Sequence, residues 1–386
     1  MDTVRIGIIG MGNIGRFHAG YLLDGKIAGA KLTAVCSTSP QKLSDYATKG
    51  LRVFANGDEL IRSGAADAVL IATPHFQHVS LGIAAFRSGL HVLVEKPIAA
   101  HKADAERLIA AARAKPELKF AAMFQMRVEP RYEIMRRMIR GGELGTLIRI
   151  NWIATDWFRS EAYYASSAWR ATWKGEGGGV LINQSLHQLD TLQWMIGMPS
   201  RVRGFCELGK FHAIEVEDSV TAHFEWPDKS TGVFCASTGE LPGTNRLEIV
   251  GTRGRLLLEN ESLTHDKLAV ASDEWSRTAK LGFAKPEIER LKIPFANAEA
   301  PHATLTQSFV DAIRTGAPLR CPGEDGLGSI ELANAIVFSS MTDRTIDLPL
   351  DSAAYEKFLA GLITYSRTTK RVIESSAEDF AKSFRK

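Results

Sequence analysis

Two groups of polar side chains have the residue types needed to move a proton and stabilise charge on a hydroxyl group. In the first, Thr73-Pro74-His75 through His78 and Glu95-Lys96-Pro97 each follow an apolar run. In the second, Asn183, His187 and Asp190 are spaced four and three apart, which would place them near one face of a helix. A histidine near neutral pKa can accept a proton from an alcohol. Each residue also has an ordinary interpretation, the lysine as a surface charge and the histidine as a helix or core residue.

A glycine loop near the start of the chain predicts a dinucleotide site. Gly10-Met11-Gly12-Asn13-Ile14-Gly15 follows an apolar strand and precedes a helical run over residues 13–23. Gly10 permits the tight turn, Gly12 allows the backbone to approach a pyrophosphate, and Gly15 allows close packing of helix on strand. The helix N-terminus would offer unpaired N–H groups to the phosphates.

The residues after the second apolar run bear on the choice of cofactor. A carboxylate that would bind a ribose 2′-hydroxyl is missing there, and Ser37, Thr38, Ser39 and Lys42 stand in its place. Hydroxyl groups do not repel a 2′-phosphate, and Lys42 could pair with it. This pattern favours NADP(H) over NAD(H). The alternative is that Ser37 to Ser39 only begin the next helix, with NAD(H) bound through hydroxyls.

The spacing of apolar runs predicts an α/β fold in two domains. In the first domain, residues 1–124, buried strands are expected over 4–9, 32–36, 68–72, 91–94 and 120–124. Helical segments lie between these strands. Such alternation is typical of a parallel Rossmann sheet. In the second, residues 125–386, strands over 147–153, 220–224, 232–236, 246–250 and 255–259 are joined by short turns, which predicts a mostly antiparallel sheet. Helices are expected over 131–140, 181–196, 304–315 and 329–340, and from 353 onward.

Aromatic and basic residues crowd the segment before the second group. The set comprises Trp157, Arg159, Tyr163, Tyr164, Trp169, Arg170 and Trp173. Aromatic rings with hydrogen-bonding neighbours suit the faces and hydroxyls of a sugar, although each residue fits an aromatic core or subunit contact equally well.

Composition excludes several classes of partner. The chain has 47 basic and 44 acidic residues, a net charge of +3, and no basic block of the kind that tracks phosphates, so we expect no nucleic-acid partner. The opening apolar run is too short for a membrane span, and no export signal follows, so we expect a cytoplasmic protein without membrane contact. The four cysteines are scattered and none lies at zinc-site spacing, so no metal is expected.

Taken in order, these motifs resemble the Gfo/Idh/MocA oxidoreductases, a family that includes inositol, glucose and other sugar dehydrogenases. The resemblance rests on Ile6-Gly7-Ile8-Ile9 with its glycine loop, Thr73-Pro74 to His78, Glu95-Lys96-Pro97, and the glycine segment leading to Asn183 and His187. It extends less specifically through Trp169-Arg170, Glu176, Pro242-Gly243-Thr244-Asn245-Arg246, Asp311-Ala312-Ile313 and Leu348-Pro349-Leu350. It covers nearly the whole chain.

The resemblance implies roles for individual residues. Lys96 would lie near the nicotinamide and the reacting hydroxyl, and His187 would transfer the proton. Many members have aspartate where this chain has Asn183, and an amide is a poor proton relay, so Asn183 is expected to orient substrate. The open sheet of the second domain often forms oligomer contacts in the family, which implies a homodimer or homotetramer.

The expected site has a cofactor part and a substrate part. The cofactor residues are Gly10, Met11, Gly12, Asn13, Ile14, Gly15, Ser37, Thr38, Ser39, Lys42, Thr73, Pro74, His75, His78, Glu95, Lys96 and Gln125. The substrate residues are Lys96, Arg159, Tyr163, Trp169, Arg170, Asn183 and His187.

The expected reaction is hydride transfer between nicotinamide and a ring hydroxyl or keto group of a sugar, polyol or sugar derivative, with Lys96 and His187 catalytic. One alternative, suggested by relatives, is glycoside cleavage through transient oxidation with the cofactor retained. Another is a non-enzymatic NAD(P)-binding sensor or assembly protein.

Overall fold

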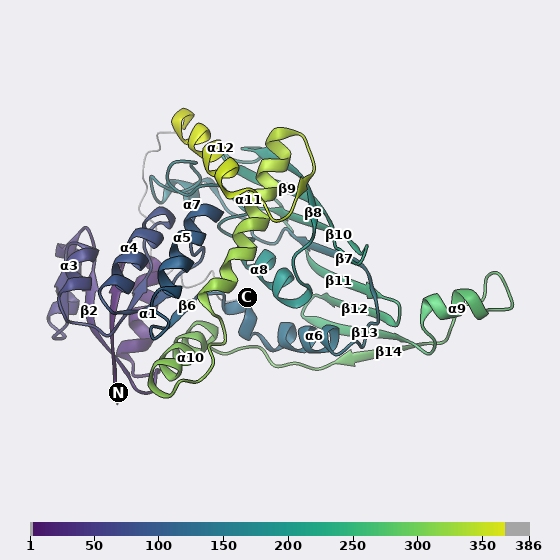
Figure 1. Ribbon diagram of the computed structural model, residues 1–386, viewed down its shortest axis with the longest axis horizontal. Helices are drawn as coiled ribbons and strands as arrows, with labels where there is room; N and C mark the ends of the chain where they lie inside the picture. The colour runs from purple at the N-terminus through teal and green to yellow at the C-terminus, as the bar shows by residue number, and fades with distance from the viewer. Residues whose placement is uncertain (1–2, 367–386) are drawn as a thin grey trace.

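A computed structural model of the protein describes residues 3–366, which form two β-sheets with helices on and between them (Figure 1). The first sheet has the strand order β3-β2-β1-β4-β5-β6, and all neighbours are parallel. Its strands are β1 (Val4–Ile9), β2 (Ala30–Cys36), β3 (Arg52–Phe54), β4 (Ala68–Ile71), β5 (His91–Val94) and β6 (Phe120–Ala122). The predicted Rossmann sheet is confirmed, with β3 as an additional short edge strand.

Helices connect these parallel strands and cover them. They are α1 (Asn13–Leu23), the 3₁₀ helix η1 (Pro40–Leu43), α2 (Ser44–Ala47), α3 (Gly57–Arg62), α4 (His75–Arg87) and α5 (Lys102–Arg113). Every residue of β4 is buried, because helices on both faces of a parallel sheet exclude water from it. This double burial is why the strands could be recognised as continuous apolar runs.

The second sheet has nine strands in the order β14-β13-β12-β11-β7-β10-β9-β8-β15. All neighbours are antiparallel except β7 and β10, so the prediction of a mostly antiparallel sheet is confirmed. The strands are β7 (Leu147–Ala154), β8 (Arg201–Leu208), β9 (Glu217–Glu225), β10 (Thr231–Ser237), β11 (Asn245–Gly251), β12 (Gly254–Glu259), β13 (Ser262–Leu268), β14 (Ile288–Ile293) and β15 (Ile346–Asp347).

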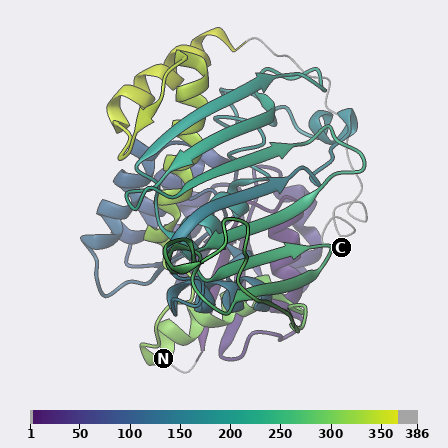
Figure 2. The same ribbon diagram turned by 90° about the vertical axis from the view of Figure 1, so that its right-hand side faces the viewer.

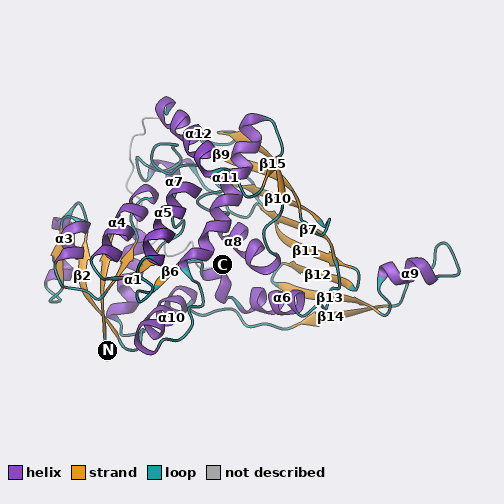
Figure 3. Ribbon diagram, viewed as in Figure 1, coloured by secondary structure: helices purple, strands orange, loops and turns teal. Residues whose placement is uncertain are grey.

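Helices cover one face of this sheet and leave the other open. The helices of this half are η2 (Gln125–Val128), α6 (Pro130–Arg140), α7 (Glu161–Ala165), α8 (Leu186–Ile196), α9 (Ser272–Thr278), α10 (Pro301–Thr315), η3 (Gly323–Asp325), α11 (Gly326–Thr342) and α12 (Ser352–Tyr365). Figure 3 shows α6, α8 and α11 between the two sheets. Figure 2 shows the opposite face, over which the described chain places only the arm that carries α9.

Helix α10 returns to the first sheet although it follows the last long strands of the second. The hydroxyl of Tyr21 on α1 lies 2.7 Å from Oγ1 of Thr306, and the amide of Ala28 donates to Gln307 at 2.7 Å. The predicted helix from residue 353 is present as α12, and the rest of that prediction, from 367 to 386, lies outside the described residues. Among residues 3–366, no helix combines the length and apolar character of a membrane span.

Candidate active site

The glycine loop has the geometry of a phosphate cradle. Gly10 has a φ of +101°, and a Cβ there would lie 2.5 Å from the carbonyl oxygen of Ala72. A Cβ on Gly15 would lie 2.0 Å from the carbonyl oxygen of Gly10, so the helix could not approach the strand so closely with another residue. A Cβ on Gly12, the N-cap of α1, would meet nothing within 4 Å, and no side chain caps this helix. The open space and the uncapped N–H groups fit a pyrophosphate.

The turn after β2 collects hydroxyl groups and two basic side chains. Ser37 Oγ accepts from the backbone N of Ser39 at 3.2 Å, and η1 begins directly afterwards. Arg16, on α1, donates to the carbonyl oxygen of Lys42 at 3.3 Å. The sequence did not single out Arg16, because it lies 26 residues from Lys42 and only the fold brings it to this turn.

The loops after β4 and β5 are tied together by His78. Its two ring nitrogens each lie 2.7 Å from a carbonyl oxygen, one of Thr73 and one of Pro97. The imidazole is fully buried, so the place of His78 in the predicted cofactor site is indirect: it holds the two loops in register. The neighbouring Thr73 differs, because its buried Oγ1 has no hydrogen-bond partner among residues 3–366.

Lys96 reaches across from the first sheet to the segment before α8. Its Nζ donates to the backbone carbonyl oxygen of Asn183 at 2.9 Å and to Oδ1 at 3.4 Å. Burial lowers the pKa of Lys96 to about 8, while the carboxylates of Glu95 and Glu176 oppose that shift. At neutral pH the amine is therefore cationic, but it holds its proton weakly.

The segment that carries Asn183 is folded by glycines and a buried carboxylate. Glu217 Oε1 accepts from the backbone N of Gly179 at 2.8 Å and of Leu181 at 3.1 Å. A Cβ on Gly179 would lie 2.0 Å from the carbonyl oxygen of Glu217, which requires glycine there. Burial raises the pKa of Glu217 to about 7.

These turns correct the predicted helix over 181–196. The backbone N of Ser185 donates to the carbonyl oxygen of Val180 at 2.8 Å, and α8 begins only at Leu186. Asn183 therefore lies in the turn before α8 rather than on one helical face with His187. Asp190 does not reach the same site, because its two oxygens each accept from Arg127 at 2.7 Å.

Tyr163 and Glu176 hold the side chain of Asn183. The Tyr163 hydroxyl accepts from Nδ2 of Asn183 at 3.3 Å and from Nε2 of Gln184 at 3.0 Å. The same amide of Asn183 donates to Glu176, which is buried and also accepts from the backbone N of Ala171 at 2.6 Å. The Oδ1 of Asn183 is thereby turned toward Lys96. Sequence spacing gave Glu176 no role, since its contacts form only in the folded chain.

His187 is a buried histidine with one nitrogen left over. Its Nε2 lies 3.3 Å from Nε2 of Gln125, whereas its Nδ1 makes no hydrogen bond in the described part of the chain, and neither does Oε1 of Gln125. Burial lowers the pKa of His187 well below its ordinary value, and the positive charge of Lys96 adds to this effect. The imidazole is therefore neutral at physiological pH and able to accept a proton.

The aromatic and basic segment divides into core and site residues. Tyr164 and Trp173 are buried, and the Tyr164 hydroxyl lies 2.8 Å from Oγ1 of Thr238, so both belong to the core. Two guanidinium groups lie near the ring of Tyr163, with Arg159 5.0 Å and Arg170 4.6 Å from its centre.

Trp169 joins this segment to the loop after β4. Its ring lies 5.5 Å from that of His75, and Arg170 stands 4.9 Å from its centre. His75 in turn has its Nδ1 3.0 Å from the carbonyl oxygen of Glu176. The structure therefore brings the predicted substrate residues together around Lys96 and Asn183.

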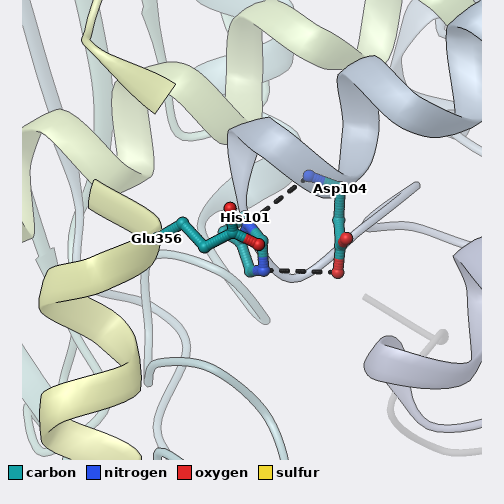
Figure 4. A group of neighbouring side chains, drawn as sticks. All are labelled: His101, Asp104 and Glu356. Atoms are coloured by element: carbon teal, nitrogen blue, oxygen red, sulfur yellow. Dashed lines mark hydrogen bonds and ion pairs between the residues drawn. The ribbon is translucent and has the colours of Figure 1, made fainter. Parts of the chain in front are cut away.

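A separate cluster of His101, Asp104 and Glu356 has ligand-type atoms within 4.8 Å of one another (Figure 4). Arg107 already donates to both carboxylates, at 2.6 Å to Asp104 and at 2.7 and 2.8 Å to Glu356. His101 is the N-cap of α5. The cluster is thus explained as an ionic link between α5 and α12.

Comparisons with known proteins show the family to which the chain belongs. Residues 4–122 match the model of the oxidoreductase family with an NAD-binding Rossmann fold, and residues 132–257 match the GFO/IDH/MocA C-terminal domain. Inositol 2-dehydrogenase of Rhizobium meliloti (strain 1021) is 26% identical over 353 residues, which cover 90% of this chain and 99% of the relative. The 1,5-anhydro-D-fructose reductase of Ensifer adhaerens is 25% identical over 348 residues, 89% of this chain and 98% of the relative.

A solved structure extends the likeness to the whole fold. The WlbA dehydrogenase from Bordetella pertussis, in complex with NADH and UDP-GlcNAcA, has a TM-score of 0.76 and 25% sequence identity. The match covers 90% of this chain and all of that one. The protein is therefore a member of the Gfo/Idh/MocA family of NAD-binding oxidoreductases.

Proposed function

We propose that this protein transfers hydride between a nicotinamide cofactor and a ring carbon bearing a hydroxyl or keto group on a sugar, polyol or sugar derivative. The observation that carries the proposal is the contact of Lys96 Nζ with Asn183 beyond the carboxyl end of β5, beside a neutral His187 whose pKa the charge of Lys96 lowers. In open α/β sheets this edge is where ligands bind. The names of the relatives, which act on inositol and an anhydro sugar, support the substrate class.

The site residues divide the work of alcohol oxidation. The nicotinamide, when bound, accepts the hydride. His187 takes the hydroxyl proton as a neutral imidazole, the form in which its lowered pKa keeps it. The Lys96 ammonium stabilises the negative charge that develops on the substrate oxygen. Asn183 orients the substrate and Lys96 together, and Tyr163, Trp169, Arg159 and Arg170 offer ring faces and donors to the remaining hydroxyls.

For the cofactor we propose a preference for NADP(H). Lys42 and Arg16 bring two positive charges to the turn after β2, beside the hydroxyls of Ser37 to Ser39, and such a turn suits a 2′-phosphate. The solved relative from Bordetella pertussis contains NADH, so the preference needs its own measurement. Titration of the protein with NADH and NADPH, in parallel with the variant Lys42→Ala, tests it. Equal affinities in the unaltered chain would contradict it.

We further propose that the open face of the second sheet pairs with a second copy of the chain. On β7, β10 and β8 the inward residues are buried, whereas Ile153, Val233 and Phe205 point outward and are 37%, 38% and 55% exposed. An apolar sheet face of this kind is typical of an interface. Light scattering of the unaltered chain and of Val233→Asp tests the pairing.

Replacement of Lys96 by Met and of His187 by Ala tests the main proposal against a panel of sugars and polyols. Each variant is expected to lose about 10² or more in NAD(P)-coupled turnover, the size typical of a lost charge-stabilising or proton-transfer group. Lys174→Met, which removes an exposed lysine from the neighbouring segment, serves as the control and should keep its activity. Undiminished turnover in both site variants would overturn the mechanism, and sugar release without net NAD(P)H would favour glycoside cleavage instead.

A further inference from the structure

A line of buried hydrogen bonds runs from the Lys96 loop to helix α10. Glu95 Oε2 accepts from the backbone N of Lys96 at 3.1 Å, and Glu95 Oε1 lies 2.6 Å from Nε2 of His18. The other nitrogen of His18 lies 2.5 Å from the hydroxyl of Tyr21, which lies 2.7 Å from Oγ1 of Thr306. Residues from three distant parts of the chain are thus joined end to end at Lys96.

The line is enclosed by protein along its length. His18 and Thr306 are 0% exposed, and Glu95 and Tyr21 are 7% exposed. Burial alone would raise the pKa of Glu95, but the hydrogen bond from His18 and the electrostatic effect of its neighbours outweigh burial and hold the pKa of Glu95 below its usual value. Glu95 therefore stays ionised in a place where an unpaired carboxylate would take up a proton.

An ionised Glu95 matters because the surroundings of Lys96 otherwise disfavour its charge. Burial acts most strongly against the ammonium, and the guanidinium groups of Arg170 and Arg159 add to it. The buried imidazoles nearby, His75, His78, His187 and His302, have lowered pKa values and contribute no compensating negative charge. Among the strongest influences on the pKa of Lys96 from the described residues, Glu95 and Glu176 raise it, and of the two Glu95 has the larger effect.

We propose that Glu95 is a positioning residue that keeps Lys96 cationic, and that His18, Tyr21 and Thr306 act on Lys96 through Glu95 by holding its carboxylate ionised and in one orientation. Helix α10, which carries Thr306, thereby affects Lys96 through this line of hydrogen bonds. The value of this device for catalysis rests on the proposed function, in which the Lys96 ammonium stabilises charge on the substrate. The ionisation of Lys96 is a separate quantity and can be measured without substrate.

The test follows the Lys96 ammonium directly. The full-length protein is labelled with ¹³C at the lysine Cε, the Lys96 signal is assigned by its loss in Lys96→Arg, and its chemical shift is titrated with pH in the absence of substrate. In Glu95→Gln the midpoint is expected to fall by about 1 pH unit or more, the usual effect of losing a nearby opposite charge in a buried site. Smaller shifts in the same direction are expected for His18→Gln and for Tyr21→Phe, which removes one hydroxyl at nearly constant volume.

A second buried ion pair provides the control. Glu331 lies 2.9 Å from Lys102, between α11 and α5, so Glu331→Gln removes a buried carboxylate of the same kind elsewhere. It should lower the melting temperature without moving the Lys96 midpoint. An unchanged midpoint in Glu95→Gln, or in Tyr21→Phe if the first variant does not fold, overturns the inference even if the enzyme oxidises sugars. If no sugar is oxidised but the midpoint moves, the proposed function fails and the inference stands.

Discussion

His187 and Asp190 lie about one turn apart on α8, and their surroundings are opposite. Asp190 is completely buried, and each of its oxygens accepts from Arg127 at 2.7 Å. Arg127 uses a further nitrogen to donate to Asp325 at 2.6 Å, which ties α8 to η2 and η3. His187 is also buried, yet its Nδ1 has no partner among residues 3–366. One short helix thus presents a satisfied polar group and an unsatisfied one.

The difference separates Asp190, which stabilises the fold, from His187, for which we propose a part in the reaction. Leaving a buried donor or acceptor unpaired costs about 1–3 kcal/mol, so folding alone does not favour the environment of His187. Oε1 of Gln125 and Oγ1 of Thr73 share this condition, and all three lie in the loops and the helix that surround Lys96. A ligand that binds there would satisfy groups that the protein leaves open. By contrast, Arg127 and Asp190 complete each other and need no ligand.

The largest effect, a loss of stability, is expected when Asp190 is replaced, because its hydrogen bonds are satisfied within the protein. Among the described residues, Asp190→Ala leaves the buried guanidinium of Arg127 with only Asp325 as counterion. Removal of one partner of a buried ion pair costs about 3–5 kcal/mol of stability. Denaturant titration measures this loss, while turnover per folded molecule should stay near that of the unaltered chain. Asp190→Asn, which keeps the shape, should lose less. A large fall in turnover with stability intact would place Asp190 in the active site.

A smaller free-energy change is expected when His187, the residue with an unsatisfied nitrogen, is replaced. His187→Gln removes the proton acceptor but keeps a polar side chain beside Gln125, so turnover should fall about 100-fold while stability changes by no more than about 1 kcal/mol. His91→Gln is the control, because His91 accepts from the backbone N of Lys119 at 2.8 Å at the start of β5 and touches no site residue. If His187→Gln kept its turnover, His187 would not be the proton acceptor and would not differ from Asp190 in this respect.

The first sheet was predictable from sequence because its signals are local. Glycines at fixed spacing encode the loop, and strands buried on both faces appear as unbroken apolar runs. The second sheet was predicted only in part. Strands β8 (Arg201–Leu208) and β14 (Ile288–Ile293) mix charged and apolar residues, since much of their surface is exposed, and neither was identified.

The residue types of the candidate site could be proposed from the sequence, but their contacts could not. Lys96 and His187 were identified from their motifs, but the pairing of Asp190 with Arg127 joins residues 63 positions apart. Helix α8 starts five residues later than the periodicity indicated, because hydrogen bonds to Glu217 hold the preceding turns in another form. Such long-range partners leave no trace in local spacing.

His302 can be compared with His187 and Asp190, because it is a third buried polar group and faces the site from α10. Its ring lies 5.9 Å from that of His18, and burial lowers its pKa from 6.5 to about 4. Between these two pH values the unfolded chain binds a proton at this residue and the folded chain does not. The contribution of His302 to the free energy of unfolding is therefore complete above the pKa of the unfolded chain. It is lost as the pH falls toward the pKa of the folded chain, with a slope of up to about 1.4 kcal/mol per pH unit.

His302→Gln is expected to remove this slope from the free energy of unfolding, measured by denaturant titration at several pH values across that interval. Turnover at neutral pH, where His302 is already neutral, should change far less than in His187→Gln. That result would group His302 with Asp190 as support for the site. If the variant instead kept the slope and lost turnover as His187→Gln does, His302 would touch the reacting groups, and the residues that take part in the reaction would extend from α8 to α10.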